Sequence, residues 1–303
     1  MSTKRTIFED VSEKTAEPIP QLGLIDQGQN IGARTAIRAW MILLFLLVWT
    51  MILVGGLTRL TDSGLSITEW QPLTGALPPM NEAAWLVEFE KYKQIPEYQL
   101  QNAGMSLSEF QFIYWWEWGH RQLGRFIGLV WALGFAVFYI TKKIPTGWTP
   151  KLLLLGALGG LQGAIGWWMV HSGLGGEMLD VASYRLATHL GLAFVILGFI
   201  TWFVLQISNS DKDLLQRRRG REAKLFSMST GLMHFAFLQI LIGALVAGID
   251  AGRNYVDWPL MAGGFFPPFM FELQPIWRNF FENDGTVQFV HRIVAYVLFI
   301  YAI

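Results

Sequence analysis

The chain contains no cysteine among its 303 residues. This absence excludes disulfide bonds, thiolate metal ligands, iron–sulfur clusters and cysteine nucleophiles, so any metal must be held by histidine, carboxylate or a cofactor. Charge is also scarce, because 15% of the residues are charged, against roughly 25% in an average soluble domain. By contrast, 52% of the residues are hydrophobic and 14 are tryptophan. This composition is typical of an integral membrane protein.

The N-terminal segment, 1–38, is polar and carries charges of both signs. It lacks the short apolar core of a signal peptide, and its acidic residues argue against a mitochondrial transit peptide. We therefore expect a cytoplasmic tail.

Six apolar stretches follow, each long enough to span or nearly span a bilayer. Lysine and arginine concentrate in the connections after the second and fourth stretches, which the positive-inside rule places in the cytoplasm, together with the N-terminus. The first, third and fifth connections then lie outside. The sequence thus predicts an all-α, polytopic membrane protein. Its apolar stretches are 39–57, one running through His120 to 140, 152–170, 186–207, 225–248 and 287–303.

The first outer connection is more than fifty residues long, and loops of that length are usually functional. Within it, 81–92 has apolar residues at helical spacing, separated by acids and a lysine. This pattern indicates a short amphipathic helix at the membrane interface; an ordinary packed loop helix fits the pattern equally well.

An internal repeat links the two ends of the chain. The segments 70–79 and 258–268 are similar, and each is followed by a His-Arg pair, at 120–121 and 291–292, where the next apolar stretch opens. The first two stretches thus correspond to the last two. Partners for the third and fourth would lie beyond the last residue, so we expect a C-terminally truncated eight-helix protein of two four-helix halves. A natural six-helix protein is the alternative. The predicted domains are the tail 1–38, the N-terminal half 39–207, a basic cytoplasmic linker 208–224 and an incomplete C-terminal half 225–303.

Four polar residues stand where the second stretch enters the membrane: Glu117, His120, Arg121 and Arg125. Charged groups at such a depth are costly and usually mark a working site. Glu117 and His120 are three residues apart, which puts them on one helical face. A histidine, a carboxylate and two guanidiniums fit a heme site. The alternative is an interfacial belt, with tryptophans at the headgroups and the charges reaching water.

The expected depth in the membrane identifies which histidines can bind one heme iron together. His120 and His189 both lie near the start of stretches that enter from outside, so they should stand at similar depth in one four-helix unit. Two such histidines can clamp an iron porphyrin from opposite sides, which makes them predicted ligands of a heme iron. In the second half the candidate is His291. Gln288 stands where the first repeat has Glu117, an asymmetry that suits one half for chemistry and the other for holding a cofactor.

Two further histidines fail the depth test. His234 lies about 21 Å from the outer end of its stretch, at 1.5 Å per residue, too deep to pair with His291; we predict a buried polar contact or a minor site. His171 ends the third stretch, where we predict a surface position at the interface.

Taken together, several motifs resemble the heme A synthase family over almost the whole chain after the tail. They are GGLTRLTDSGLS at 55–66, the segment 70–79, EWGHR at 117–121, ATHLG at 187–191 and FVHR at 289–292. The lack of cysteine is similar to the cysteine-free branch of that family, found in proteobacteria and mitochondria.

The resemblance implies eight helices in two pseudo-symmetric bundles. It implies that one porphyrin methyl group of heme O is oxidised to a formyl group through successive hydroxylations, giving heme A for cytochrome oxidase. The half with His120 and His189 would be the substrate site, with Glu117 as the catalytic residue. The half with His291 would hold a heme b that passes electrons, its second ligand lying beyond the last residue.

Arg121, Arg125 and Arg292 are predicted to bind heme propionates, because guanidinium groups match carboxylates in pairs and keep their charge when partly buried. Binding of lipid headgroups is the alternative for these three residues.

The implied location is the bacterial inner (cytoplasmic) membrane, crossed several times. The implied partners are the lipid bilayer, heme O, the enzyme that makes it and an electron donor that the sequence does not identify. A homo-oligomer stays open, and we expect no nucleic acid.

Two other functions compete with this one. One is a membrane b-type cytochrome acting only in electron transfer, which would need no acid such as Glu117 beside its iron. The other is a transporter with inverted repeats, but the two copies here run in the same direction.

Overall fold

The computed structural model describes residues 32–175 and 178–303, and most of the predicted tail lies outside them. Six of its helices are long and apolar enough to cross a membrane, as the sequence predicts. They are α1 (Arg34–Leu60), α4 (Leu107–Ile140), α5 (Thr149–Val170), α6 (Ser183–Ile207), α8 (Ala223–Gly248) and α10 (Asp284–Ala302).

The connections contain shorter elements. The predicted loop helix is confirmed as α2, and the basic linker contains a helix, α7, that was not predicted. These elements are η1 (Thr74–Ala76), α2 (Glu82–Tyr92), α3 (Pro96–Leu100), α7 (Asp211–Arg219), η2 (Ala251–Arg253), η3 (Ile276–Arg278) and α9 (Asn279–Glu282).

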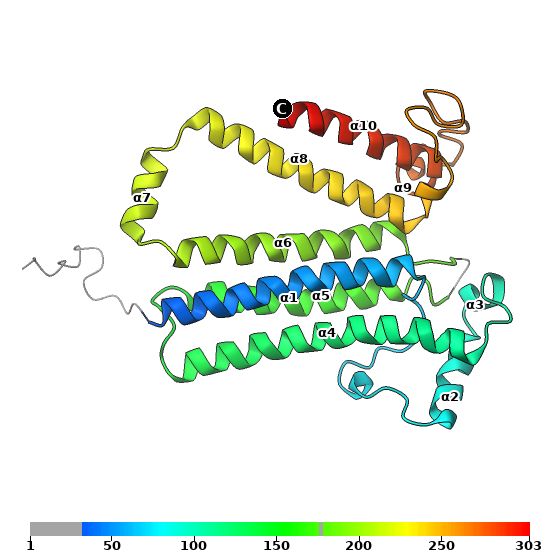
Figure 1. Cartoon of the computed structure of the whole chain (residues 1–303), viewed down its shortest axis with the longest axis horizontal. Helices are drawn as coiled ribbons and strands as arrows, with labels where there is room; N and C mark the ends of the chain where they lie inside the picture. Colours follow the sequence, from blue (N-terminus) through cyan, green and yellow to red (C-terminus); the bar gives the residue numbers. More distant parts are fainter. Residues whose placement is uncertain (1–31, 176–177) are drawn as a thin grey trace, which may run out of the picture.

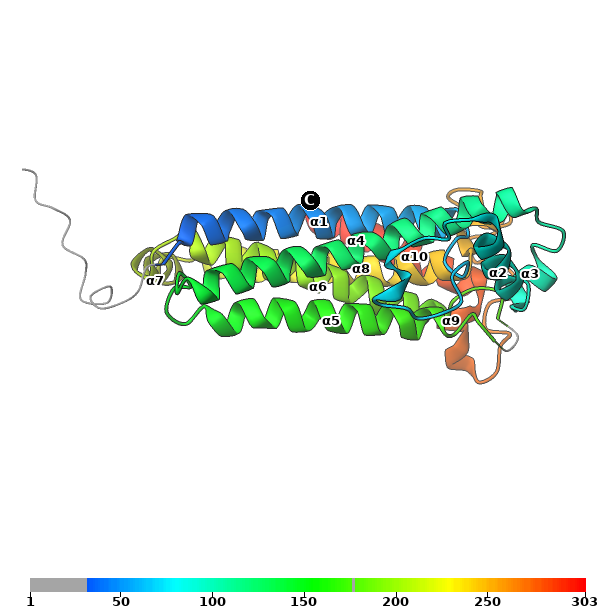
Figure 2. The ribbon, with the colours of Figure 1, turned by 90° about the horizontal axis from the view of Figure 1, so that it is seen from below.

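Helices α1, α4, α5 and α6 lie side by side as a four-helix bundle (Figures 1 and 2). Helix α8 packs on α6, and α10 packs on α8 at the edge of the molecule. Helix α7 lies at one end of the bundle, whereas α2, α3 and α9 gather at the other end. We call this second end the loop end.

Local chemistry sets where the helices begin. Ser106 caps α4 by accepting from the backbone N–H of Glu109, whose side chain accepts in return from the Ser106 N–H; this reciprocal pair satisfies two N–H groups that a helix start leaves unpaired. Helix α1 begins at Arg34, five residues before the predicted start at residue 39. The earlier start places the Arg34 side chain against the end of α6. Its guanidinium donates to the carbonyls of Ile207 (3.1 Å) and Asn209 (2.8 Å) at the end of α6, where a cation is favourable.

Tryptophan–glycine pairs bring the bundle helices close together. The Trp40 indole lies against Gly134 and donates to the Val130 carbonyl at 3.1 Å, joining α1 to α4. Trp131 lies in the same way against Gly156 of α5. Any side chain at either glycine would collide with the indole, so both positions require glycine.

Two hydrophobic clusters fill the first half. The bundle cluster comprises Ile37, Trp40, Met41, Leu44, Val48, Trp148, Leu152, Leu155, Ile196, Leu197, Ile200, Phe203 and Ile207. The loop cluster comprises Leu65, Ile67, Trp85, Phe89, Tyr92, Ile95, Phe110, Ile113, Tyr114, Val170 and Val181. On α4, His120 follows the loop-cluster residues that end at Tyr114, and on α6, His189 precedes the bundle-cluster residues that begin at Ile196. We call the level of these two histidines the histidine layer.

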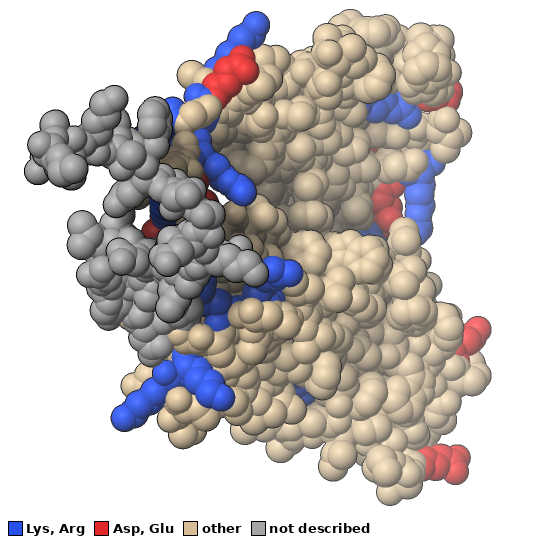
Figure 3. Space-filling model, turned by 60° about the vertical axis from the view of Figure 1, so that its left-hand side comes forward, with Lys and Arg blue, Asp and Glu red and all other residues tan. Residues whose placement is uncertain are grey.

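Charge is distributed unequally between the two ends. Figure 3 shows mainly basic side chains over the α7 end of the molecule and both acidic and basic ones at the loop end. The last turn of α7 consists of Arg217, Arg218 and Arg219. Positive charge at this end of a helix interacts favourably with the helix dipole.

Candidate functional site

His120 and His189 point into the bundle, each against a glycine of a neighbouring helix. A methyl group added at Gly55 of α1 would lie 3.3 Å from Nε2 of His120. One added at Gly166 of α5 would lie 2.8 Å from Cε1 of His189. Each glycine therefore leaves space that the imidazole of the other helix occupies.

Both imidazoles therefore face the interior of the bundle, one from α4 and one from α6. That they form one site stays a prediction from their matched depth. Nδ1 of His189 is buried and has no hydrogen-bond partner among the described residues. Buried polar atoms are normally paired, so an unpaired ring nitrogen in this layer suits two imidazoles that ligate a metal from opposite sides.

Glu117 is buried one turn before His120, and both of its carboxylate oxygens are engaged. Oε2 accepts from the Ser66 hydroxyl and from the Ile67 N–H, both at 2.7 Å. Oε1 accepts from Nε (3.0 Å) and Nη2 (2.6 Å) of Arg121. The carboxylate thus ties the loop after α1 to the helix that carries His120.

Arg121 and Arg125 bind the backbone of that loop. Arg121 donates to the Ile67 and Glu69 carbonyls at 2.8 and 2.9 Å. Arg125 donates to the carbonyls of residues 71 and 72, also at 2.8 and 2.9 Å. Irregular backbone beside a membrane helix needs such partners. Both guanidinium groups therefore donate hydrogen bonds to loop carbonyls in this structure. Propionate binding by them stays a prediction.

An aromatic contact closes the loop over α5. Trp70 stacks on Trp167, with ring centroids 6.0 Å apart and planes 13° apart. The guanidinium carbon of Arg121 lies 5.9 Å from the Trp167 ring centroid, within cation–π range. The loop therefore bridges α4 and α5 on the loop side of the histidine layer.

The second half repeats the histidine–glycine contact. A methyl group at Gly243 of α8 would lie 3.1 Å from Cε1 of His291. Arg292 donates to the carbonyls of Tyr255 (2.6 Å) and Asp257 (2.9 Å) in the loop after α8. Gln288 donates to the same Tyr255 carbonyl at 2.9 Å.

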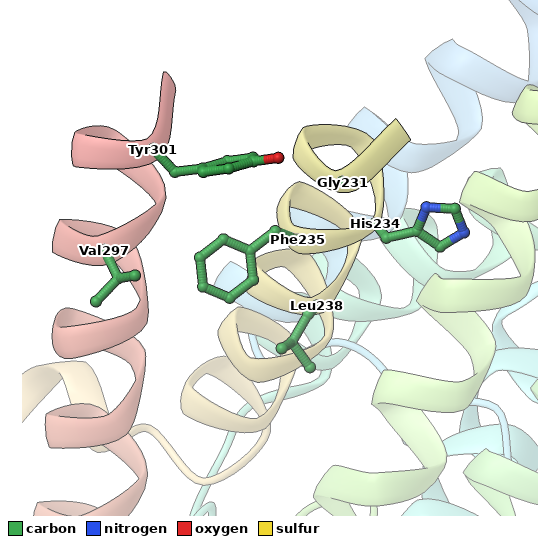
Figure 4. Close-up of a pocket in the computed structure, with 6 residues that line it drawn as sticks. All are labelled: Gly231, His234, Phe235, Leu238, Val297 and Tyr301. Carbon is green, nitrogen blue, oxygen red and sulfur yellow. The ribbon is translucent and has the colours of Figure 1, made fainter. Parts of the chain in front are cut away.

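The other two histidines lie outside these sites. His171 is exposed at the end of α5, as predicted. His234 is exposed rather than buried, and its Nδ1 lies 2.7 Å from the Thr230 carbonyl of its own helix. It lines an apolar pocket between α8 and α10, where Tyr301 reaches toward α8 while the His234 ring turns away from α10 (Figure 4).

Three groups were missed at the sequence level. Ser66 contacts Glu117 because the loop after α1 folds back onto α4. No periodic pattern in the sequence predicts this contact. Gln162 is a polar residue in an apolar stretch, a signal that was present; its amide donates to the His189 carbonyl at 2.9 Å. Glu97 of α3 is buried, and burial, with a smaller contribution from the nearby negative charge of Asp180, raises the pKa of its carboxyl to about 8.

Comparison with known proteins gives one family. Residues 38–303 match the model of the COX15-CtaA family, described as cytochrome oxidase assembly protein. A protein named heme A synthase from Ruegeria pomeroyi is 65% identical over all of this chain and 80% of its own length. Those of Dinoroseobacter shibae and Paracoccus denitrificans are 66% and 62% identical over 98% and 99% of this chain, and 78% and 79% of theirs. No solved structure matches.

Proposed function

This chain belongs to the COX15-CtaA family of cytochrome oxidase assembly proteins, and we propose that its first four-helix half holds the substrate heme between His120 and His189. As a heme A synthase, the chain is a membrane oxidoreductase that converts heme O to heme A. The observation that carries the assignment of the site is the pair of inward-pointing imidazoles, each against a glycine.

The two imidazoles would hold the substrate by its iron, one from α4 and one from α6. The bound heme would supply the redox chemistry at the methyl group. The residues of the chain would hold the porphyrin in place and keep water away, because the bundle cluster lies on one side of His120 and His189 and the loop cluster on the other. A site enclosed in this way protects reactive intermediates from side reactions.

Glu117 is proposed as the catalytic acid–base residue beside His120. Its carboxylate already accepts four hydrogen bonds, which fix its position. A proton taken from the substrate edge would be held on Glu117 only after one of those partners moves. Arg121, which supplies two of the four bonds, is the partner whose movement would free an oxygen.

The second half is proposed to hold heme b through His291, with Gly243 leaving space for the ring. Arg121, Arg125 and Arg292 are proposed to bind heme propionates once the porphyrin occupies each half. Each would then exchange a loop carbonyl for a carboxylate, which forms stronger, charge-assisted bonds.

The chain is a multi-pass membrane protein. We propose that it lies in the bacterial inner membrane with its N-terminus and α7 in the cytoplasm, since the basic side chains gather there (Figure 3). The loop end, with the substrate site near it, would then face outward. The enzyme that makes heme O, an electron donor and a second copy of the chain remain candidate partners.

The test is extraction of pigments from membranes that contain the protein and are supplied with heme O. Heme A in the extract is the expected result. Unchanged heme O, in a protein whose bound heme still undergoes reduction and oxidation, would overturn this function in favour of an electron-transferring b-type cytochrome.

A further inference from the structure

The loop after α1 turns back along α4 after it leaves the end of the bundle. Figures 1 and 2 both show this loop, between α1 and α2, running beside α4 toward the α7 end. Side chains of α4 hold it there. The Gln122 amide donates to the Ala76 carbonyl at 2.7 Å, and Arg125 donates to the carbonyls of residues 71 and 72. The loop therefore lies against the outer side of a helix that the sequence places in the membrane.

The depth of this loop follows from helix geometry. The Ala33 N–H donates to the Lys143 carbonyl at 2.9 Å, so α1 begins level with the point where α4 ends. From that level α1 extends about 39 Å, at 1.5 Å per residue. By the same rise, Gln122 and Arg125 lie only about 27 and 22 Å from Ile140, the last residue of α4. The carbonyls that they bind therefore lie at the boundary of a hydrocarbon core, which is about 30 Å thick.

The backbone of this segment has the hydrogen bonds that such a depth requires. Irregular backbone is tolerated beside lipid only when its polar groups are paired within the protein. Arg121, Gln122 and Arg125 together bind the carbonyls of residues 67, 69, 71, 72 and 76. Within the loop, the N–H groups of residues 75 and 76 donate to the carbonyls of residues 71 and 73, both at 3.2 Å. The prolines at 72, 78 and 79 have no N–H to satisfy.

The opposite side of the segment exposes large apolar side chains. Leu73, Leu77 and Met80 are 85%, 75% and 78% exposed. A single exposed leucine is common on any protein surface, but three large apolar side chains within one short loop form a patch that marks a contact with another apolar phase. The patch continues a surface of α4. On the helix face of Arg125, one and two turns farther along, Leu129 and Leu133 are also exposed.

The loop after α8 repeats this arrangement with aromatic residues. Arg292 donates to the carbonyls of residues 255, 257 and 260. The Trp258 indole donates at 2.7 Å to the hydroxyl of Tyr296, which stands where the first half has Arg125. Three large apolar side chains of this loop are exposed: Phe265, Phe266 and Phe269. Two loops related by the internal repeat thus bind a helix through their backbone and expose large apolar side chains.

We propose that both loops insert into the membrane leaflet at the loop end, with Leu73 and Leu77 of the first loop and Phe266 of the second among the lipid acyl chains. Lipid is the partner that fits, because the exposed patch of the first loop continues the apolar face of a membrane-spanning helix. Interfacial segments bury apolar side chains at this boundary in the same way. Contact with lipid then holds each loop against the helix that carries His120 or His291. The inference does not depend on heme binding.

The experiment uses the absence of cysteine, which lets one position at a time carry a label. Leu73→Cys, Leu77→Cys and Phe266→Cys are each spin-labelled and reconstituted into vesicles of phosphatidylcholine and phosphatidylglycerol. Electron paramagnetic resonance then measures collisions with oxygen, which concentrates among acyl chains, and with a water-soluble nickel chelate present on both sides. Leu133→Cys, on the exposed apolar face of α4, is the control for lipid. Glu90→Cys, at a side chain that is 62% exposed on α2, is the control for water.

The three loop labels are expected to behave like the label of Leu133→Cys, with frequent oxygen collisions and loss of the nickel collisions that Glu90→Cys shows. Nickel collisions as frequent as those of Glu90→Cys would place the loops in water and overturn the inference. Few collisions with either reagent would mean that protein covers the patch, either a second copy of the chain or another partner, and would also overturn it. Circular dichroism checks that each variant is folded. The measurement needs no heme, so its failure would leave the heme sites of the proposed function untouched.

Discussion

The two halves differ in the chemistry of their buried polar groups. In the described part of the first half, both Glu97 and Glu117 are buried carboxyl groups. At the loop end of the second half, the buried polar residues are Asn279, Thr286 and Gln288, none of which titrates. Burial of a carboxyl group is costly unless it is paired or protonated. Among the described residues, the fully buried carboxyl groups therefore lie in the first half, as expected of a half that performs the chemistry.

The framework around this difference is the same in both halves. Arg121 and Arg292, each next to its histidine, donate to loop carbonyls at corresponding positions of the repeat: 67 and 69 in one, 255 and 257 in the other. Asp62 and Asp250 also correspond, and both adopt the left-handed backbone conformation, with φ of 48° and 52°. The halves thus share the device that holds the loop on the helix and differ at Glu117 and Gln288.

The largest expected effect comes from removing one histidine in each half. His189→Ala should abolish both heme O binding in the first half and heme A formation, because one axial ligand is lost. His291→Ala should leave heme O binding in the first half intact. Absorption spectra of the purified proteins and pigment extraction check both outcomes. His171→Ala, exposed at the end of α5, is the matched control. Equal loss of heme O from both variants would show that the halves do not bind separately.

Glu117→Gln is expected to reduce heme A formation by about 100-fold, the lower range for loss of a general acid–base group. The amide has one acceptor oxygen, so it loses either Arg121 or the Ser66 pair, and we expect stability to fall by about 1–3 kcal/mol. Heme A yield, the heme spectrum and thermal unfolding are measured together. A normal spectrum with lost product supports the catalytic role, whereas a weakened spectrum would show that Glu117 positions His120. The same change at exposed Glu109 in the same helix is the control, and full activity of Glu117→Gln would exclude both roles.

A third effect concerns the contact between the halves. Arg59 of α1 lies 2.7 Å from Asp62, 3.5 Å from Asp180 and 3.0 Å from Asp250 of the second half. Arg59→Met should lower the free energy of unfolding by about 1–3 kcal/mol, since it removes charged hydrogen bonds. In a double-mutant cycle with Asp250→Asn the two effects should not add.

The control for this cycle is Arg253→Met. The Arg253 side chain is 62% exposed and lies 3.6 Å from Asp250 and 3.8 Å from Asp62, so its loss should change stability by less than about 1 kcal/mol. Additive effects of Arg59→Met and Asp250→Asn would mean that Arg59 does not couple the halves.

The helices and the histidine layer could be predicted from sequence because both depend on position along apolar runs. Spacing alone places His120 and His189 at one depth and relates 117–121 to 288–292. Helix α7 was also within reach, since Ser210 and Asp213 form a capping box at the start of the basic segment that we interpreted as a plain linker.

The path of the loop after α1 could not be predicted from the sequence. Arg125 has the composition expected of an anion-binding residue, yet it is bonded to the carbonyls of 71 and 72. Those bonds depend on turns that place the loop backbone along α4, and no periodic pattern encodes them. The partners of Glu117 were hidden for the same reason, because Ser66 lies 51 residues away in the chain.

The smallest expected effect is a pH dependence of α2 and α3 in the first half, and it originates at Glu97. Burial raises the pKa of this carboxyl from 4.5 to about 8, so the folded protein binds a proton that the unfolded chain releases above about 4.5. Its contribution to stability is therefore present below pH 4.5 and is lost as the pH rises toward 8, since stability falls with pH wherever the folded state binds more protons.

Hydrogen exchange of α2 and α3 should accordingly become faster between pH 5 and pH 8, beyond the intrinsic rise in exchange rate. Glu97→Gln, which mimics the neutral form, should remove this extra dependence from α2 and α3. The control is Glu90→Gln on the exposed side of α2, where the carboxylate bonds Lys93. A response of α2 and α3 that survives Glu97→Gln would mean that the buried carboxyl of Glu97 does not set their pH dependence.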